Sequence, residues 1–379
     1  MFRKIVFWGH LAAGLAAGVF VLLMAVTGVV LTYETQITDF AVAQAVTVPA
    51  GGEPLGPDML VSAVLEGGAE PGQTLILPRE VGAPASLRSG RSGVAVDPYT
   101  GATLPDAGAA IAAFFASVTA LHRWLSLSGP TDVGGAMIGA SNLVFLLLVI
   151  SGLYLWLPPA FRWGLIRMRL VFRRGLPSAQ ARHYNWHHAF GFWALVPLFV
   201  IVLSGVVMSY PWANSLLYAA VGEEAPQGRG GPGGNAALPT GLRGAVLAAD
   251  PQSYDALIAS AAEKVPEWKR ASITLPAPEA AYLQVTMDAG NGVQSAAQTQ
   301  IVLDRATTEI VSEGSGQPGQ LGSRLRRWLR FAHTGQIYGV IGQTVAGLAS
   351  LAAVMLVYTG ISLGLRRLAR MRRQRRAVA

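Results

Sequence analysis

The sequence predicts a membrane protein built as an all-α four-helix bundle, with two α+β modules outside the bilayer. Hydrophobic residues make up 52% of the 379 residues and charged residues only 13%, which is too apolar for an ordinary soluble enzyme. Four stretches without a charged side chain or histidine are long enough, at ~1.5 Å per residue, to cross the ~30 Å hydrocarbon layer. These stretches are Leu11–Tyr33, Val133–Leu157, Ala189–Tyr210 and Gly339–Leu365.

The distribution of charge predicts the orientation. The segments before the first span, between the second and third, and after the fourth hold 15 Lys and Arg and no Asp or Glu. Since Lys and Arg in short flanking segments stay on the cytoplasmic side, both termini are expected in the cytoplasm. All 21 acidic residues then lie on the outer face. The basic pI therefore reflects topology and lipid contact, and no nucleic-acid partner is expected.

These observations predict a fixed order of segments along the chain. An N-terminal cleavable signal peptide is the alternative for the first span, but its apolar core is too long, so an uncleaved anchor is expected. The order is transmembrane helix 1 within 1–33, an outer module at 34–128, a span at 133–157, an Arg-rich cytoplasmic loop at 158–188, a span at 189–210, an outer module at 211–337, a span at 339–365 and a basic cytoplasmic tail at 366–379.

Both outer modules show the same pattern of a helix followed by strands. Asp97 and Asp304 stand at equivalent turns, where a carboxylate accepts local backbone N–H bonds. A run rich in Gly and Pro at 228–234 predicts a flexible connector. The expected elements are Asp58–Glu66, Thr74–Leu77 and Val94–Leu104 in the first module, and Tyr254–Lys264, Ala271–Leu275, Ala281–Met287 and Ile301–Val311 in the second.

The repeat extends into the spans. Each predicted span contains a hydroxyl residue followed by glycine, and the chain reads as two tandem halves of span, module and span. Because each half starts and ends on the same side, a pseudo-two-fold axis along the membrane normal is expected. The four hydroxyl–glycine pairs are Thr27-Gly28, Ser151-Gly152, Ser204-Gly205 and Thr359-Gly360.

All six histidines lie at or near the ends of the spans. His10 and His187 each precede a hydroxyl–glycine pair by 17 residues, which predicts equal depth near the cytoplasmic surface. Gly14 and Gly191 follow them by one helical turn and are expected to leave room for a flat macrocycle.

A second pair is expected on the outer face. His122 and His333 end two amphipathic stretches that should rest on the membrane surface. The topology therefore predicts one histidine pair at each face of the bilayer.

Two neutral imidazoles from facing helices are what a low-spin b-type haem requires, so two haems are expected, and the chain has no cysteine for other redox centres. Propionates need cationic partners; Arg123, Arg326 and Arg330 lie near the outer pair and Arg182 near the inner pair. His187 is the inner ligand by register, with His188 and His183 as open alternatives. Zinc or copper is disfavoured because the pairs lack carboxylate or thiolate partners.

Several motifs resemble those of the PepSY-associated transmembrane proteins. They are Leu121-His-Arg-Trp-Leu, Ser-Gly-Leu-Tyr-Leu-Trp156, His187-His-Ala-Phe-Gly-Phe-Trp193, His333-Thr-Gly and, in the first module, Val-Asp-Pro-Tyr-Thr-Gly101. The resemblance implies a bacterial inner-membrane protein and, by analogy with di-haem members, reduction of ferric siderophores at the periplasmic face. It places the haem-iron ligands at His10, His122, His187 or His188, and His333.

The expected function is thus electron transfer from quinol or a cytoplasmic reductase, through two haems, to a ferric siderophore or another periplasmic acceptor. The chain would then be a membrane ferric-chelate reductase. The alternative is a haem-free PepSY anchor that binds or restrains a periplasmic protein. A transporter is disfavoured because the spans contain no charged residue.

Overall fold

The computed structural model describes residues 1–47, 49, 52–90, 92–127, 133–158, 160–226, 238, 240–242, 244–315 and 320–378. The chain divides into two compact units. We call them the helical unit (Met1–Glu34, Phe114–Ala225 and Leu325–Ala379) and the sheet unit (Thr35–Ala113 and Pro226–Arg324). The predicted connector at 228–234 lies outside the described residues.

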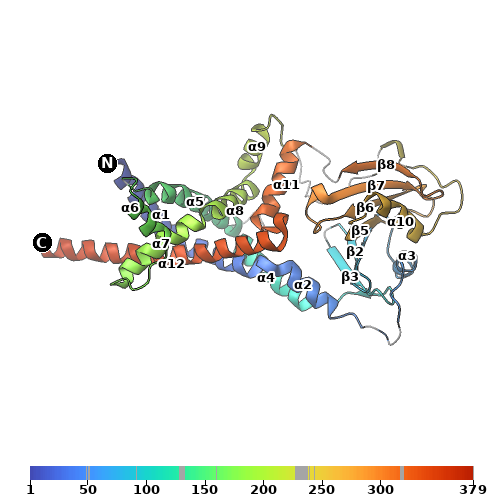
Figure 1. Ribbon diagram of the computed structural model, residues 1–379, viewed down its shortest axis with the longest axis horizontal. Helices are drawn as coiled ribbons and strands as arrows, with labels where there is room; N and C mark the ends of the chain where they lie inside the picture. Colours follow the sequence, from blue (N-terminus) through green and yellow to red (C-terminus); the bar gives the residue numbers. More distant parts are fainter. Residues whose placement is uncertain are drawn as a thin grey trace. The chain divides into compact units, whose positions relative to one another are not determined.

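Apolar helices long enough to cross a membrane form the core of the helical unit (Figure 1). They are α1 (Phe2–Val30), α5 (Val133–Trp156), α12 (Gly339–Val378) and the pair α7 (Ala179–Trp193) and α8 (Leu195–Ser209). Helix α1 contacts α5 and α12, while α8 contacts the same two helices. Small residues such as Ala25, Ala349 and Ala353 are buried between them and allow close approach of the backbones.

The third predicted span is not one straight helix. Helices α7 and α8 are bent by 69° at Ala194, and α7 already begins at Ala179, inside the predicted cytoplasmic loop. Pro197 explains the break, because it has no N–H to donate and its ring clashes with the carbonyl of residue Trp193, four positions earlier. The 17-residue interval from His187 to Ser204 therefore does not correspond to the same axial distance as the interval from His10 to Thr27.

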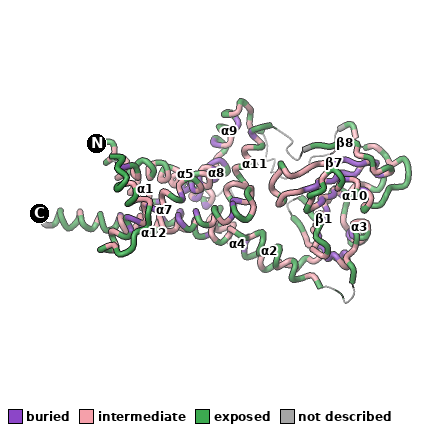
Figure 2. The backbone as a smooth tube through the Cα atoms, in the orientation of Figure 1, coloured by how far each residue is buried: buried purple, intermediate pink, exposed green. Residues whose placement is uncertain are grey.

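Several helices extend beyond or add to the prediction. Helix α1 continues into α2 (Glu34–Ala43), and α12 includes most of the predicted basic tail, whose side chains are largely exposed (Figure 2). The two amphipathic stretches form α4 (Ala109–Trp124) and α11 (Leu321–His333). The sequence did not predict α6 (Trp163–Leu170), α9 (Pro211–Ala219) or the short helices η1 (Leu31–Tyr33), η2 (Thr240–Leu242), η3 (Ser295–Ala297) and η4 (Gln336–Tyr338).

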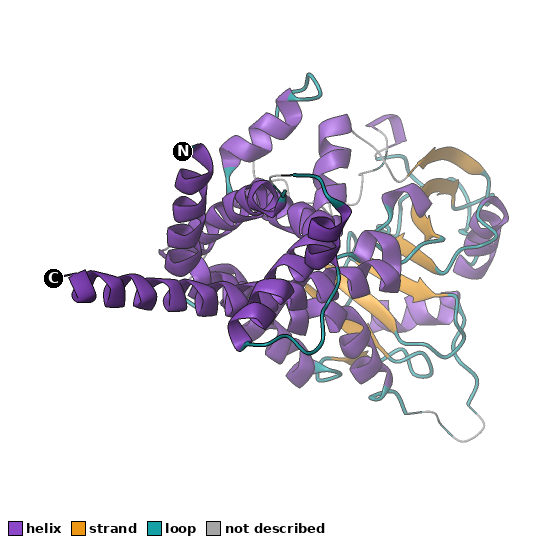
Figure 3. Cartoon of the chain, turned by 60° about the vertical axis from the view of Figure 1, so that its left-hand side comes forward, coloured by secondary structure: helices purple, strands orange, loops and turns teal. Residues whose placement is uncertain are grey.

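The strands of the two predicted outer modules join in a single antiparallel sheet in the sheet unit, whose strands are orange in Figure 3. Its strand order is β4-β3-β2-β1-β5-β6-β7-β8, and the halves join where β1 pairs with β5, with Ile76 opposite Ser272. The strands are β1 (Thr74–Pro78), β2 (Ala85–Ser89), β3 (Ser92–Val96), β4 (Thr103–Leu104), β5 (Arg270–Thr274), β6 (Tyr282–Asp288), β7 (Gln298–Asp304) and β8 (Ile310–Ser315).

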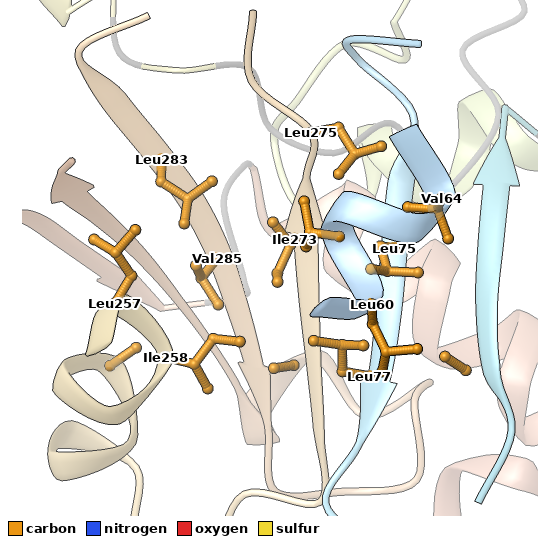
Figure 4. Packing of buried hydrophobic residues seen from close by; sticks show 14 of the residues in the cluster. Leu60, Val64, Leu75, Leu77, Leu257, Ile258, Ile273, Leu275, Leu283 and Val285 are labelled. Atoms are coloured by element: carbon orange, nitrogen blue, oxygen red, sulfur yellow. The ribbon is translucent and has the colours of Figure 1, made fainter. Parts of the chain in front are cut away.

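The core of the sheet unit lies between the strands and two helices, α3 (Pro57–Glu66) and α10 (Tyr254–Lys264) (Figure 4). Alternate residues of the central strands, such as Leu75 and Ile273, are fully buried, as period-2 patterning requires. The turn role of Asp97 is confirmed, because its Oδ1 accepts the N–H groups of Tyr99 and Thr100. Asp304 makes the equivalent bonds in the second half.

Candidate functional site

Four histidines of the helical unit each contact the hydroxyl group of one hydroxyl–glycine pair. In every case the histidine Nδ1 lies within hydrogen-bond distance of the hydroxyl oxygen. The four pairs are His10 with Ser151 at 2.8 Å, His122 with Thr27 at 2.7 Å, His187 with Thr359 at 3.0 Å and His333 with Ser204 at 3.0 Å. All four predicted ligands are thus held by the same type of contact.

The direction of these hydrogen bonds follows from the second contact of each hydroxyl. Each hydroxyl donates its only proton to a carbonyl three or four residues earlier in its own helix, as Thr27 does to Leu23 and Thr359 does to Met355. Ser151 and Ser204 bond in the same way to Leu147 and Ile201. The hydroxyl oxygen must therefore accept a hydrogen bond from the histidine, which places the imidazole proton on Nδ1.

His333 gives an independent check on this assignment. Its Nδ1 also lies 2.8 Å from the carbonyl oxygen of Ile201, and a carbonyl can only accept. The proton is therefore on Nδ1, and Nε2 carries the lone pair. A neutral imidazole whose Nδ1–H is fixed by a second group is the form in which histidine binds a metal through Nε2.

In two of the pairs, the glycine makes room for this contact. A Cβ added to Gly360 would lie 3.2 Å from Cε1 of His187, and one added to Gly152 would lie 3.4 Å from Cε1 of His10. At Gly205 the nearest atom is instead the Nδ2 of Asn142, at 2.7 Å. The hydroxyl therefore orients the ring, and in two of the pairs the adjacent glycine lets the ring approach the helix.

Gly14 and Gly191 do not contact the histidine rings in this way. A Cβ on Gly14 would contact Leu148 at 3.9 Å, and one on Gly191 would contact Leu356 at 3.6 Å. Both glycines thus face a leucine of a neighbouring helix, α5 or α12. Their expected role beside a flat macrocycle stays a prediction.

His122 and His333 face each other from α4 and α11. Their ring centroids are 6.4 Å apart, and the ring planes are inclined by 73°. Two imidazoles that share one metal are separated by two metal–nitrogen bonds of ~2.0 Å each plus the radius of each ring, which sums to about 6 Å. The pair therefore has the spacing of two axial ligands.

Burial keeps this pair neutral. The pKa of His122 is lowered to about 4 by burial and, to a lesser extent, by His333 and Arg123. The pKa of His333 is also lowered, by burial first and then by Arg330 and Arg123. Both imidazoles are therefore uncharged at pH 7, and the two arginines predicted beside them are close enough to act on them.

The second pair consists of His10 on α1 and His187 on α7, which lie within range of electrostatic interaction. The structure also places the alternatives to His187. His188 donates Nδ1–H to the carbonyl of Tyr184 at 2.9 Å, and His183 lies 2.8 Å from the hydroxyl of Ser362. Of these three neighbours on α7, His187 is the one that bonds to a hydroxyl–glycine pair.

Two of the arginines predicted as propionate partners lie over tryptophan rings. Arg123 lies over the ring of Trp124 at 4.4 Å, and Arg182 lies over Trp186 at 5.7 Å. The Nε of Arg326 is buried and has no hydrogen-bond partner among the described residues. Within the same residues, no group of three or more His, Asp or Glu side chains could hold a metal ion. The candidate sites are thus the two histidine pairs.

The histidine–hydroxyl contacts were not predicted, although the sequence contained a signal for them. The sequence contains four hydroxyl–glycine pairs and four predicted ligands, with two of each in each half of the chain. The hydroxyl–glycine pairs were interpreted only as evidence of the repeat. The contacts join residues up to 172 positions apart, such as His187 and Thr359, so local spacing could not reveal them.

The apolar spans and the separate antiparallel sheet define an integral membrane protein with a distinct α+β unit. A family described as the PepSY-associated TM region matches residues 7–367, which is nearly the whole chain. The chain therefore belongs to the family of PepSY-associated transmembrane proteins. A search of the curated proteins finds no match.

Proposed function

We propose that this protein carries electrons across the bacterial inner membrane and reduces a ferric chelate, a ferric siderophore, at the periplasmic face. Two b-type haems would be held by His10 with His187 and by His122 with His333. The observation that supports the proposal is the fourfold contact that fixes the proton on Nδ1 and leaves the lone pair of Nε2 free to bind a metal. Quinol or a cytoplasmic reductase would be the donor.

The residues present fit this cofactor by three criteria. The His122–His333 spacing of 6.4 Å suits two axial ligands of one iron. The ligand set is neutral and nitrogen-only, and its second shell of hydroxyl groups orients the rings. Arg123, Arg326 and Arg330 beside the outer pair, and Arg182 beside the inner pair, would bind the propionates. When bound, haem supplies reversible one-electron transfer.

The protein's own residues would prepare the sites for this chemistry. Thr27 and Thr359 hold the rings of His122 and His187 in one tautomer, so no proton has to move when an electron arrives. A hydrogen bond from Nδ1–H also raises the basicity of the ligating nitrogen. The apolar spans exclude water, and the arginines offset the carboxylates of the propionates.

The arrangement of the contacts supports two equivalent halves. In each half, the histidine of the first helix bonds to the hydroxyl of the last span, as His10 does to Ser151. The histidine of the amphipathic helix bonds to the hydroxyl of the first span, as His333 does to Ser204. A pseudo-two-fold axis along the membrane normal, with both termini in the cytoplasm and the sheet unit in the periplasm, would place one haem near each membrane surface.

The test is an absorption spectrum of the detergent-purified protein before and after dithionite. Protein made with adequate haem supply should show a Soret band and an α-band that sharpens on reduction. Absence of both bands would end the electron-transfer proposal in favour of the haem-free anchor. If bands appear, stopped-flow reoxidation of the reduced protein by a ferric chelate, with Fe(II) trapped by ferrozine, tests the reductase activity.

A further inference from the structure

Resting on the proposed function, we propose that the acceptor is an anionic ferric chelate, recognised by an arginine cluster beside the outer histidine pair. The arginine cluster consists of Arg123 on α4 and Arg326 and Arg330 on α11. A chelate whose metal-binding groups are carboxylates, with surplus negative charge, is the class that such a surface would bind.

The composition of α11 is the first observation. Its 13 residues include four arginines and no acidic residue. At ~100° per residue, Arg326 and Arg330 lie within about 60° of His333 around the helix. Arg327 lies about 120° away from it. Two of the four charges are therefore on the face that carries the ligand histidine.

The position of the cluster is the second observation. Arg330 and Arg123, from two different helices, both act electrostatically on His333, and Arg123 also acts on His122. The positive charge is thus concentrated where the last electron transfer would occur. An anion bound there would lie near the outer iron site, which shortens the path of the electron.

The third observation is an unsatisfied donor. The Nε of Arg326 is buried and lacks a hydrogen-bond partner within the described part of the chain. A buried guanidinium N–H without a partner is costly, and a carboxylate is the group that it binds best, often with two parallel bonds. The propionates would use some of these donors, and a carboxylate-rich chelate would use the remainder.

The net charge of the two segments expected outside the bilayer favours the same selection. Outside the cluster, segments 34–128 and 211–337 contain 20 acidic and 11 basic residues. A small anion is repelled by most of this surface and attracted to the cluster, and such focusing raises its local concentration at one place. A cationic chelate would be attracted to the acidic segments and repelled by the cluster.

The reaction that follows is balanced by one electron for each iron. Fe(III) in the chelate accepts one electron and becomes Fe(II), which oxygen ligands hold less tightly because its charge is lower. Fe(II) then dissociates, and the chelator leaves with its carboxylates unchanged. No covalent bond to the protein and no proton transfer is required.

The experiment measures binding with redox-inert gallium, so that no turnover occurs. The full-length protein in phosphatidylcholine nanodiscs is titrated with Ga(III)–citrate, an anion, and with Ga(III)–desferrioxamine B, a cation, by microscale thermophoresis. The Kd of Ga(III)–citrate should be at least tenfold lower than the Kd of Ga(III)–desferrioxamine B. It should rise with ionic strength. The double variant Arg326→Gln/Arg330→Gln should weaken citrate binding at least tenfold, and Arg327→Gln, on another face of the same helix, less than threefold.

Three results would overturn the inference. They are equal affinity for both chelates, unchanged binding by the double variant, and loss of citrate binding when phosphatidylglycerol is added to the nanodiscs, which would make the cluster a lipid-headgroup site. These results are separable from failure of the proposed function. Absence of haem bands rejects that function whatever the gallium data show, whereas haem-containing protein without charge preference rejects only the anionic acceptor.

Discussion

The two halves of the helical unit differ in shape but share the same histidine contacts. In the first half α1 is continuous from Phe2 to Val30, whereas in the second half α7 and α8 are bent by 69°. Helix α11 is strongly basic, while Arg123 is the one arginine of its counterpart α4. Even so, His10 and His187 meet Ser151 and Thr359 in the same way.

The two halves share the contacts between histidines and hydroxyl groups despite these differences. A bend changes the path of a span, and a change of charge alters its surroundings, yet each imidazole is still held through Nδ1 by a hydroxyl. The helix geometry therefore differs between the halves, while the histidine–hydroxyl contacts are the same. Since these histidine–hydroxyl contacts are shared by both halves, we infer that they carry the common function of the two halves.

The largest effect should come from removing the ligands in either half. His187→Ala and His10→Ala should each remove about one of two haems, as should His122→Ala and His333→Ala, because a haem with one axial ligand is bound weakly. The pyridine haemochrome assay on purified protein measures this. His188→Ala, next to His187 but bonded to the carbonyl of Tyr184, is the matched control and should retain both haems.

A variant set with the opposite outcome would change the assignment. Loss of one haem in His188→Ala, with both haems kept in His187→Ala, would make His188 the inner ligand. It would also separate the second half from the first, in which His10 has no histidine neighbour.

The glycine next to a hydroxyl should be the next most sensitive position. Gly360→Ala places a Cβ about 3.2 Å from Cε1 of His187, so the ring must shift by a few tenths of an ångström. We expect lower occupancy of the inner haem and a broadened α-band, with the outer haem unaffected. Gly164→Ala on α6 has open space around its Cβ and should leave the spectrum unchanged. An unaltered spectrum for Gly360→Ala would show that the close approach is not needed.

Removal of one hydroxyl should have a smaller effect. Thr27→Ala leaves the Nδ1–H of His122 without its hydroxyl acceptor, at a cost of ~1–3 kcal/mol, and should shift the midpoint potential of one haem in a redox titration. Thr27→Ser should restore the potential because it returns the hydroxyl. Thr32→Ala removes a hydroxyl that donates to the Gly28 carbonyl and should not change the potential. Equal potentials in all three variants would contradict an orienting role for Thr27.

The sheet unit should unfold without a direct effect on the proposed haem sites. Ile273 is fully buried in its core, and Ile273→Ala should destabilise this unit by ~2–5 kcal/mol. Circular dichroism during thermal unfolding should show a transition at a lower temperature for this variant than for the unaltered protein. The haem bands of the folded protein should not change, since the four proposed ligands all belong to the helical unit. Loss of haem at temperatures where the sheet is folded would contradict this separation.

The sequence predicted the parts of the fold that depend on local patterns. Charge-free apolar stretches located three spans, and alternation located most of the strands, with β2 as an exception. Strand β2 was missed because its residues Ala85–Ser89 include no aromatic or β-branched side chain. The union of both modules into one sheet depends on the pairing of Thr74 with Thr274, a contact between distant segments that no local pattern encodes.

The candidate site was predicted in its residues but not in its connections. The positions of His122 and His333 before two spans suggested a pair, and the structure brings their rings within 6.4 Å. Hydropathy does not predict the bend at Ala194, because an apolar stretch of suitable length fits one straight helix; Pro197 is the local signal for the bend. The hydroxyl contacts required knowledge of which helices are neighbours, and hydropathy contains no such information.

We propose that each histidine pair binds one haem through Nε2. The most direct measurement is the haem stoichiometry of the purified protein combined with its low-temperature EPR spectrum. We expect two haems per chain and low-spin ferric signals typical of two axial imidazoles. If protein produced with an adequate haem supply contained no haem, or only high-spin haem, this proposal would be wrong.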